Sequence, residues 1–167
     1  MKRLLHLCVL CLCFICYACA DEYWVDPRGM GDYTSITEAL SAAMDGDTLI
    51  LAGDTYDSTR ETFPILVEKA VTLCAKVGET PIIASPRLVP ALELNADGIQ
   101  VSGLQIDFLR SGMWVQGNDV TVQNCAFTLA GEEWRTSSCG MWVAGAKRLT
   151  LQDYAFSGCG VAMAGPL

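Results

Sequence analysis

The sequence predicts an all-β chain that folds as a parallel β-helix, a solenoid of short strands, with a short capping helix at its N-terminal end. Three features predict this fold class: internal copies of one segment, an alternation of apolar and polar residues within each copy, and a helix-start signal before the copies begin. One copy alone cannot bury its apolar face, whereas stacked copies share a continuous core.

The N-terminal elements precede the copies and form the predicted cap, residues 23–52. Ser35 followed by Glu38 matches a capping box, and apolar residues recur after it at helical spacing, which predicts a helix over 35–44. The remaining elements expected in this half are strands over 23–25, 46–51, 65–67, 71–73 and 81–83, and a turn over 53–56.

The internal copies are clearest in the C-terminal half. Residues 112–127 (GMWVQGNDVTVQNCAF) align with residues 140–156 (GMWVAGAKRLTLQDYAF), and weaker copies start near residues 92 and 160. Equivalent apolar residues of three copies, Val101, Val122 and Leu151, lie 21 and 29 residues apart, which is the length of one β-helix coil. The longer step contains residues 128–138, which we interpret as a loop. Rungs over residues 53–167 are therefore expected, roughly five in number.

The first 20 residues have the three parts of a secretory signal peptide. A basic pair precedes an apolar run of about 14 residues, and Ala18 and Ala20 fit cleavage before Asp21. The run is shorter than the ~20 residues that span a bilayer. We expect a secreted, periplasmic or cell-surface protein with no transmembrane span in its mature chain, residues 21–167; lipid attachment at Cys19 is the alternative.

The composition after this leader argues against several function classes. The remaining 147 residues carry 9 basic and 19 acidic side chains, which disfavours nucleic acid as a partner because phosphate contacts need clustered Lys and Arg. The single His, His6, lies in the leader, so a His-based triad or a His-rich metal site is not expected. Four Cys remain, and none of their spacings matches a zinc motif.

The opening of the mature chain resembles a known family. Residues 25–36 (VDPRGMGDYTSI), 46–51 (GDTLIL) and 53–56 (GDTY) look like the start of the right-handed, single-stranded parallel β-helix proteins of the pectin lyase-like superfamily. The resemblance covers essentially all of residues 23–165 and implies a right-handed coil. It says less about activity, because the superfamily includes lyases, esterases, hydrolases, copper-enzyme maturation proteins and surface proteins. Residues 29–36 are most similar to pectin methylesterases, whose catalytic Asp pair and Arg have no match here.

The chain stops part-way through a copy, at residues 164–167. An open end of a β-helix leaves an unpaired strand edge and exposed core side chains, which natural proteins cover. We expect that the sequence is a fragment of a longer protein; the alternative is a partner over this end, for example a second copy of the chain by self-association.

The alternation within the copies also predicts a binding face. If Met113 and Val115 point into the core, Trp114 points outward, and its equivalents in the other copies are Glu93, Trp142 and Ala162. Neighbouring strands lie about 4.8 Å apart, so the two indoles should lie one above the other. Exposed indoles suit stacking on sugar rings. The predicted substrate-binding residues are Trp114, Trp142 and, in the 128–138 loop, Trp134; the alternative is an aromatic ladder packed under that loop.

Two further side-chain pairs follow from the repeat. Cys139 and Cys159 each precede the repeat glycine, and stacked equivalents fall within the Cα separation of a disulfide, so we predict a disulfide between them. Asn124 and Asp153 share one turn position with Gly103, where stacked polar side chains are expected to hydrogen-bond along the coil.

Candidate catalytic residues are acidic and basic side chains expected near one face: Asp107, Arg110, Asp119, Glu132, Glu133 and Arg135. β-Elimination of uronic acids, as in related lyases, requires a metal or Arg to neutralise the carboxylate and an Arg or Lys as base. Calcium, which takes oxygen ligands, is the cofactor considered. No spacing among these residues specifies a site, no metal ligands are assigned, and the alternative is a solvated acidic surface.

Two functions from different classes are therefore carried forward. The first is an exported protein that binds or processes polysaccharide and that, if it is an enzyme, is a lyase, esterase or hydrolase. The second is a non-enzymatic, adhesin-type surface scaffold whose loops bind a protein partner.

Overall fold

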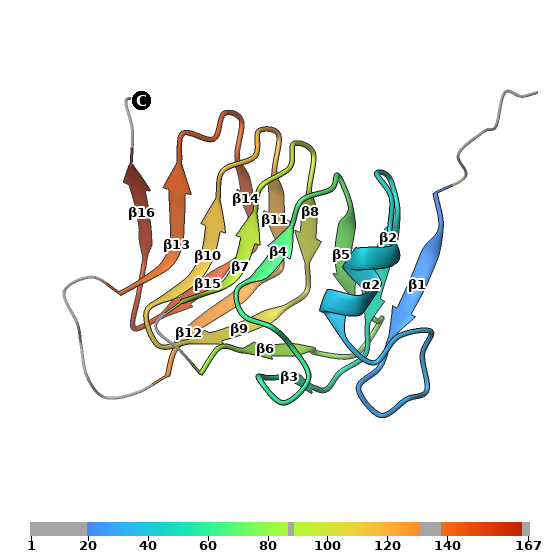
Figure 1. Ribbon diagram of the computed structural model, residues 1–167. Helices are drawn as coiled ribbons and strands as arrows, with labels where there is room; N and C mark the ends of the chain where they lie inside the picture. Colours follow the sequence, from blue (N-terminus) through green and yellow to red (C-terminus); the bar gives the residue numbers. More distant parts are fainter. Residues whose placement is uncertain (1–19, 87–88, 131–137, 165–167) are drawn as a thin grey trace, which may run out of the picture.

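Three parallel β-sheets run along the chain, and each successive coil adds one strand to every sheet (Figure 1). This computed structural model describes residues 20–86, 89–130 and 138–164. Sheet A has the order β1-β2-β5-β8-β11-β14, sheet B the order β3-β6-β9-β12-β15, and sheet C the order β4-β7-β10-β13-β16. The predicted all-β, right-handed parallel β-helix is confirmed.

Five coils follow one another after strand β1 (Glu22–Val25) and helix α2 (Ile36–Ala42). The first coil contains β2 (Thr48–Leu51), β3 (Thr55–Tyr56) and β4 (Ile65–Val67). The second contains β5 (Thr72–Ala75), β6 (Ile82–Ala84) and β7 (Pro90–Leu94). The third contains β8 (Gln100–Ser102), β9 (Gln105–Phe108) and β10 (Ser111–Val115). The fourth contains β11 (Thr121–Gln123), β12 (Ala126–Leu129) and β13 (Cys139–Ala144), and the fifth β14 (Thr150–Gln152), β15 (Ala155–Ser157) and β16 (Val161–Ala164).

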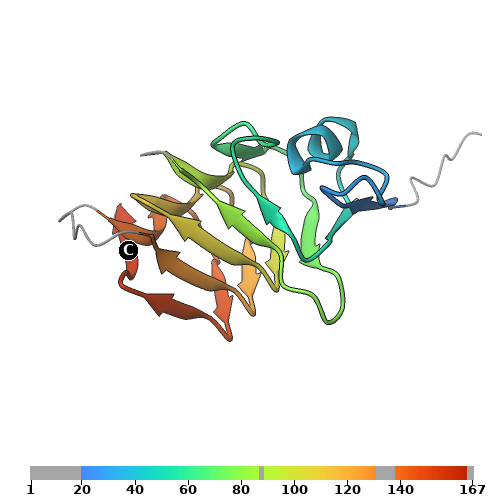
Figure 2. The same cartoon turned by 90° about the horizontal axis from the view of Figure 1, so that it is seen from below.

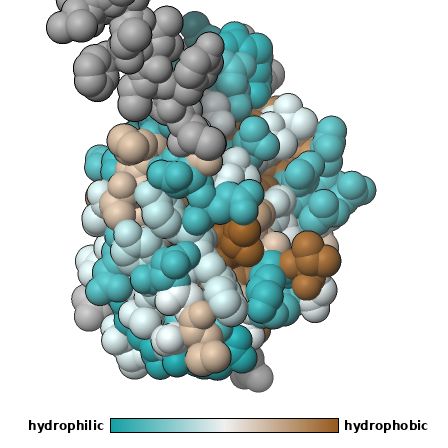
Figure 3. Space-filling model, turned by 90° about the vertical axis from the view of Figure 1, so that its right-hand side faces the viewer, coloured by the Kyte–Doolittle hydropathy of each residue, from teal (hydrophilic) through white to brown (hydrophobic). Residues whose placement is uncertain are grey.

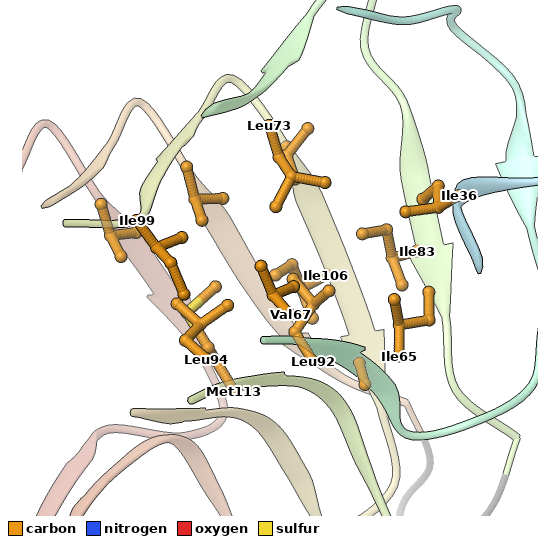
Figure 4. Close-up of a cluster of buried hydrophobic side chains, with 14 of the residues drawn as sticks. Ile36, Ile65, Val67, Leu73, Ile83, Leu92, Leu94, Ile99, Ile106 and Met113 are labelled. Carbon is orange, nitrogen blue, oxygen red and sulfur yellow. The ribbon is translucent and has the colours of Figure 1, made fainter. Parts of the chain in front are cut away.

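In-register pairing of these strands turns the sequence repeat into columns of inward side chains. One column of sheet A is Leu49, Leu73, Val101, Val122 and Leu151. The sheet B column is Tyr56, Ile83, Ile106, Phe127 and Phe156, and its last two rings stack with centroids 4.8 Å apart. Figure 4 shows buried side chains of all three sheets meeting in the space between them. Each fully buried aliphatic side chain contributes about 1.5–3 kcal/mol, so the repeated columns supply the core.

Residues 53–56 differ from the prediction, because the chain there forms strand β3 and not a turn alone. Gly53 and Asp54 turn the chain, and Thr55 and Tyr56 then pair with Ile82 and Ile83 of β6. The Tyr56 hydroxyl donates to the carbonyl oxygens of Val25 and Ala52, at 2.9 and 3.1 Å. The strand thus depends on partners in the next coil and in β1, which the local turn signal does not reveal.

Helix α2 lies with β1 at the N-terminal end of the stacked coils, and Figure 2 shows this end from a second direction. It buries Ile36, Ala39 and Leu40 against the core, as the spacing predicted. The Ser35 hydroxyl accepts a hydrogen bond from the Glu38 amide at 3.1 Å, which confirms this residue as the N-cap. Within the described part of the chain, no helix is long and apolar enough to cross a membrane.

Both ends of α2 are held by side chains that flank strand β4. The buried Glu61 carboxylate accepts from the amides of Ile36 and Thr37, at 2.6 and 3.0 Å, and from the Thr37 hydroxyl at 2.7 Å. At the other end, the Lys69 ammonium donates to the carbonyl oxygens of Leu40, Ser41 and Ala43. These bonds satisfy helix-end groups that otherwise lack partners, so α2 is fixed across the first coil.

The bends between sheets A and B use left-handed backbone at Gly103, Asn124 and Asp153, with φ of 74°, 52° and 47°. Glycine and Asn tolerate this conformation best, which explains the shared turn position. The expected side-chain ladder lies elsewhere. Within the described residues, the amide of Asn118 joins Asp97 to the backbone of Lys147, with Asn118 Nδ2 to Asp97 Oδ1 at 3.0 Å and Lys147 N to Asn118 Oδ1 at 3.0 Å.

Candidate functional site

Two tryptophans lie side by side on the outer face of sheet C. Strands β10 and β13 pair in parallel with Trp114 opposite Trp142 and with Met113 opposite Met141. Met113 and Val115 are fully buried, whereas Trp114 is 38% exposed and Trp142 is half-buried. The predicted outward direction of the two residues and their register on neighbouring strands are confirmed, because alternate side chains of a strand point to opposite faces.

The tryptophans belong to a column that continues along sheet C to the first coil. Trp114 pairs with Glu93 of β7, and Glu93 pairs with Leu66 of β4. We call the four residues Leu66, Glu93, Trp114 and Trp142 the tryptophan strip. It runs along the axis of the coil and not along a strand, since each member comes from a different coil.

A row of amides borders the strip. Gln116 lies two residues beyond Trp114 on the same face, and its Nε2 donates to Asn95 Oδ1 of the preceding coil at 3.0 Å. Both side chains are exposed. Indole faces accept the apolar faces of sugar rings, and amides both donate to and accept from hydroxyl groups. The repeat alignment could have indicated this pair, because Gln116 has the same outward phase as Trp114.

The candidate catalytic residues do not gather at the strip. Asp107 lies on β9 of sheet B, where its carboxylate accepts from Gln105 Nε2 at 3.1 Å. Arg110 is exposed in the bend between β9 and β10. Asp119 pairs with Arg148 of the next coil, and this guanidinium lowers the pKa of the Asp119 carboxyl. These groups occupy three different places on the coil, so they form no common acid–base site.

The remaining candidates, Glu132, Glu133, Trp134 and Arg135, lie outside the described residues. The described residues just before and after them, Ala130 and Ser138, follow β12 of sheet B and precede β13 of sheet C. Among the residues that the structure describes, no three His, Cys, Asp or Glu side chains gather as metal ligands. Calcium therefore has no assigned position in that part of the chain.

The cysteines occupy the predicted places. Cys139 lies opposite Ser111, with 3.6 Å between its sulfur and the Ser111 hydroxyl. Cys159 precedes β16 on the next coil, two residues before the Val161 that pairs with Met141. Burial raises the pKa of the Cys159 thiol. Both thiols are free in the structure, so the disulfide between Cys139 and Cys159 stays a prediction.

Comparison with known proteins assigns the chain to a family. A family model described as "Protein of unknown function (DUF1565)" matches residues 30–162. The chain belongs to the DUF1565 family. A crystal structure of pectate lyase Pel9A is similar to this DUF1565 chain, with a TM-score of 0.54 and 16% sequence identity. No curated protein sequence matches the chain.

The structural match confirms the pectin lyase-like fold that the N-terminal stretches of the sequence indicated. It covers 83% of this DUF1565 chain and 47% of the pectate lyase chain, so the chain spans about half the length of that structure. At 16% identity the match shows the fold alone, because one fold supports many activities. Function has to be argued from the side chains of the strip.

Proposed function

We propose that this chain is an exported polysaccharide-binding protein whose ligand lies on the tryptophan strip of sheet C. The observation that carries the proposal is the in-register pair of outward indoles, Trp114 and Trp142, with Trp114 38% exposed. Large aromatic rings on a flat outer face beside amide groups form a surface for sugar rings and their hydroxyl groups.

Binding is supported more strongly than catalysis. Acid–base cleavage of a sugar chain needs at least two positioned titratable groups at one sugar. On the described part of the strip and the amide row beside it, Glu93 is the titratable side chain that borders the indoles, while Asp107 lies on another sheet. The proposal therefore assigns no catalytic residue.

Export is supported by a contact at the expected cleavage point. The backbone nitrogen of Asp21 donates to Asp47 Oδ1 at 2.8 Å, and the amide of Met44 donates to the other oxygen at 2.7 Å. Cleavage before Asp21 would turn this nitrogen into an ammonium group beside a buried carboxylate. A charge-assisted bond is shorter and stronger than a neutral one, so the mature N-terminus would be held at this position.

Replacement of both indoles tests the proposal. About 38% of a tryptophan surface of roughly 250 Å² leaves roughly 90 Å² to cover at Trp114, which at about 25 cal/mol per Å² is worth about 2 kcal/mol. Trp114→Ala should therefore weaken polysaccharide binding about 30-fold. The test is affinity electrophoresis against glucomannan, xylan, mixed-linkage β-glucan and polygalacturonate. Trp114→Ala with Trp142→Ala should abolish retention by every polysaccharide that retains the wild type.

Tyr154→Ala is the matched control, because Tyr154 is an exposed aromatic side chain in the bend between sheets A and B. It should leave retention unchanged. Equal retention of the wild type and the double tryptophan variant would contradict the proposal. That result, together with a protein partner that binds all three variants alike, would favour the adhesin-type scaffold.

A further inference from the structure

A groove opens between helix α2 and strand β4, at the N-terminal end of the tryptophan strip. Its volume is about 280 Å³, close to the lower end of the ~300–1,000 Å³ typical of small-molecule sites. Seen from this end, the molecule shows hydrophobic surface in a hollow between hydrophilic side chains (Figure 3). The apolar lining is Leu40, Pro64 and Leu66, and the hydroxyl lining is Thr37, Ser41 and Thr62.

Leu66 joins this groove to the strip. It lies 46% exposed on the outer face of β4, and its register partner is Glu93, which in turn pairs with Trp114. From Leu66 to Trp142 the column spans three strand spacings, about 14 Å. One unit of an extended pyranose chain is about as long as one such spacing, so a chain lying on the indoles reaches the groove within a few sugars.

Helix α2 closes the far side of the groove. Leu40 and Ser41 of the helix line it, and the helix is fixed by Glu61 at one end and by Lys69 at the other. In Figure 1, α2 lies beyond β4 in the direction that leads away from β7 and β10. A chain that follows the strip toward the N-terminal end therefore meets the helix and ends in the groove.

The charges of the strip and groove indicate the class of sugar. The described carboxylates are Glu68 in the groove and Glu93 in the strip. Within the described residues, neither forms an ion pair with Lys or Arg. The Lys69 ammonium, which lies at the groove, already donates to three helix carbonyl oxygens. Among the described residues, a uronic acid at this place would meet these two carboxylates and an ammonium group that is already hydrogen-bonded, whereas a neutral sugar needs only apolar contact and hydroxyl partners.

We propose that the groove between α2 and β4 is the terminal subsite for a neutral polysaccharide whose preceding sugars lie on the indoles. The proposal rests on the proposed function and adds to it a sugar class and a position for the chain end. The Thr62 hydroxyl binds a hydroxyl of the last sugar, and Leu66 contacts its apolar face. The hydroxyl oxygens of Thr37 and Ser41 act as acceptors there, because their protons are already donated to Glu61 and to the Thr37 carbonyl oxygen.

Length-dependent binding of defined oligosaccharides tests this subsite. The probes are the tri- and hexasaccharides of cellulose, xylan and mannan, with hexagalacturonate as the charged comparison, measured by isothermal titration calorimetry. Leu66→Asp removes the apolar contact at an exposed position, and Val77→Asp makes a matched change at a 98% exposed residue in the bend between β5 and β6. Thermal unfolding of both variants checks that the fold is kept.

The expected result is that a neutral hexasaccharide binds at least tenfold more weakly to Leu66→Asp, while the trisaccharide and Val77→Asp show no change. Both lengths should lose binding when Trp114 and Trp142 are replaced. Unchanged hexasaccharide binding to Leu66→Asp, with binding lost in the tryptophan variant, would overturn the subsite and leave the proposed function standing. Preferential binding of hexagalacturonate would overturn the neutral class, and binding insensitive to the indoles would overturn the proposed function itself.

Discussion

The buried Glu61 carboxylate offers a quantitative test of how the helix is held over the first coil. Glu61→Ala would leave the buried amide of Ile36 and the half-buried amide of Thr37 without acceptors. An unsatisfied buried donor costs about 1–3 kcal/mol, so the free energy of unfolding should fall by about 2–4 kcal/mol. At about 2–4 °C per kcal/mol for a domain of this size, the midpoint of thermal unfolding should drop by roughly 5–15 °C.

Glu61→Gln keeps the shape of the side chain and isolates its charge. Burial raises the pKa of the Glu61 carboxyl, while hydrogen bonds from Thr37, Ile36 and Ser35 oppose the rise without cancelling it. A carboxyl whose pKa is raised by folding stabilises the native state fully below its unfolded value of about 4.3 and loses this contribution as the pH rises through the raised pKa. The stability difference between the wild type and Glu61→Gln should therefore shrink from pH 4 to pH 7.

Urea denaturation followed by circular dichroism at several pH values measures both effects. The difference in free energy of unfolding between two variants at the same pH cancels the contribution of titrating groups that both contain. Glu68→Ala, a change at an exposed neighbour on the same segment, should alter stability by less than about 0.5 kcal/mol. A wild-type advantage that grows with pH would refute the reasoning, since the hydrogen bonds to the carboxylate would then outweigh its desolvation. An unchanged midpoint for Glu61→Ala would refute the assigned role.

Three further outcomes concern the mature chain. N-terminal sequencing of the secreted protein should give Asp21 as the first residue, and a different first residue contradicts the cleavage point. Asp47→Asn should lower the stability of the protein above pH 4. The amides of Met44 and Asp21 lower the pKa of the Asp47 carboxyl, so its ionised form is the one that stabilises the fold. Under oxidising conditions Cys139 and Cys159 should form a disulfide that adds about 3 kcal/mol to the free energy of unfolding. Thiol titration should then find two fewer free thiols in the wild type after oxidation, and no such loss in Cys139→Ser. A full count of free thiols in the oxidised wild type would contradict the pairing.

The repeat made most of the coil predictable. Copies of one segment have to stack to bury their apolar residues, so the alignment of 112–127 with 140–156 already contains the pairing of β10 with β13. The same alternation fixes the outward direction of Trp114. Helix α2 was equally predictable, since Ser35 and the apolar spacing after it are local signals.

The features that the sequence did not predict depend on contacts between residues that are distant in the sequence. The capping box predicted Ser35 and Glu38 at the start of the helix, and both lie there. That local pattern contained no sign that the amides of Ile36 and Thr37 are bound by Glu61, 25 and 24 residues away. Strand β3 was missed because its partner β6 lies in the next coil. The ladder of polar side chains was expected at Asn124 and found at Asn118, since both bends carry suitable residues and only their packing distinguishes them.

The sequence by itself determined the fold class, the register of the later coils and the outer position of the tryptophans, because each depends on spacing within or between copies of one segment. The tertiary structure alone decided that Leu66 continues the column of the indoles, that Lys69 and Glu61 fix the helix, and that a groove lies between α2 and β4. These features require segments without sequence similarity to meet once the coil has closed. Periodicity identifies equivalent residues in successive coils, but it contains no information about contacts between residues that are not equivalent.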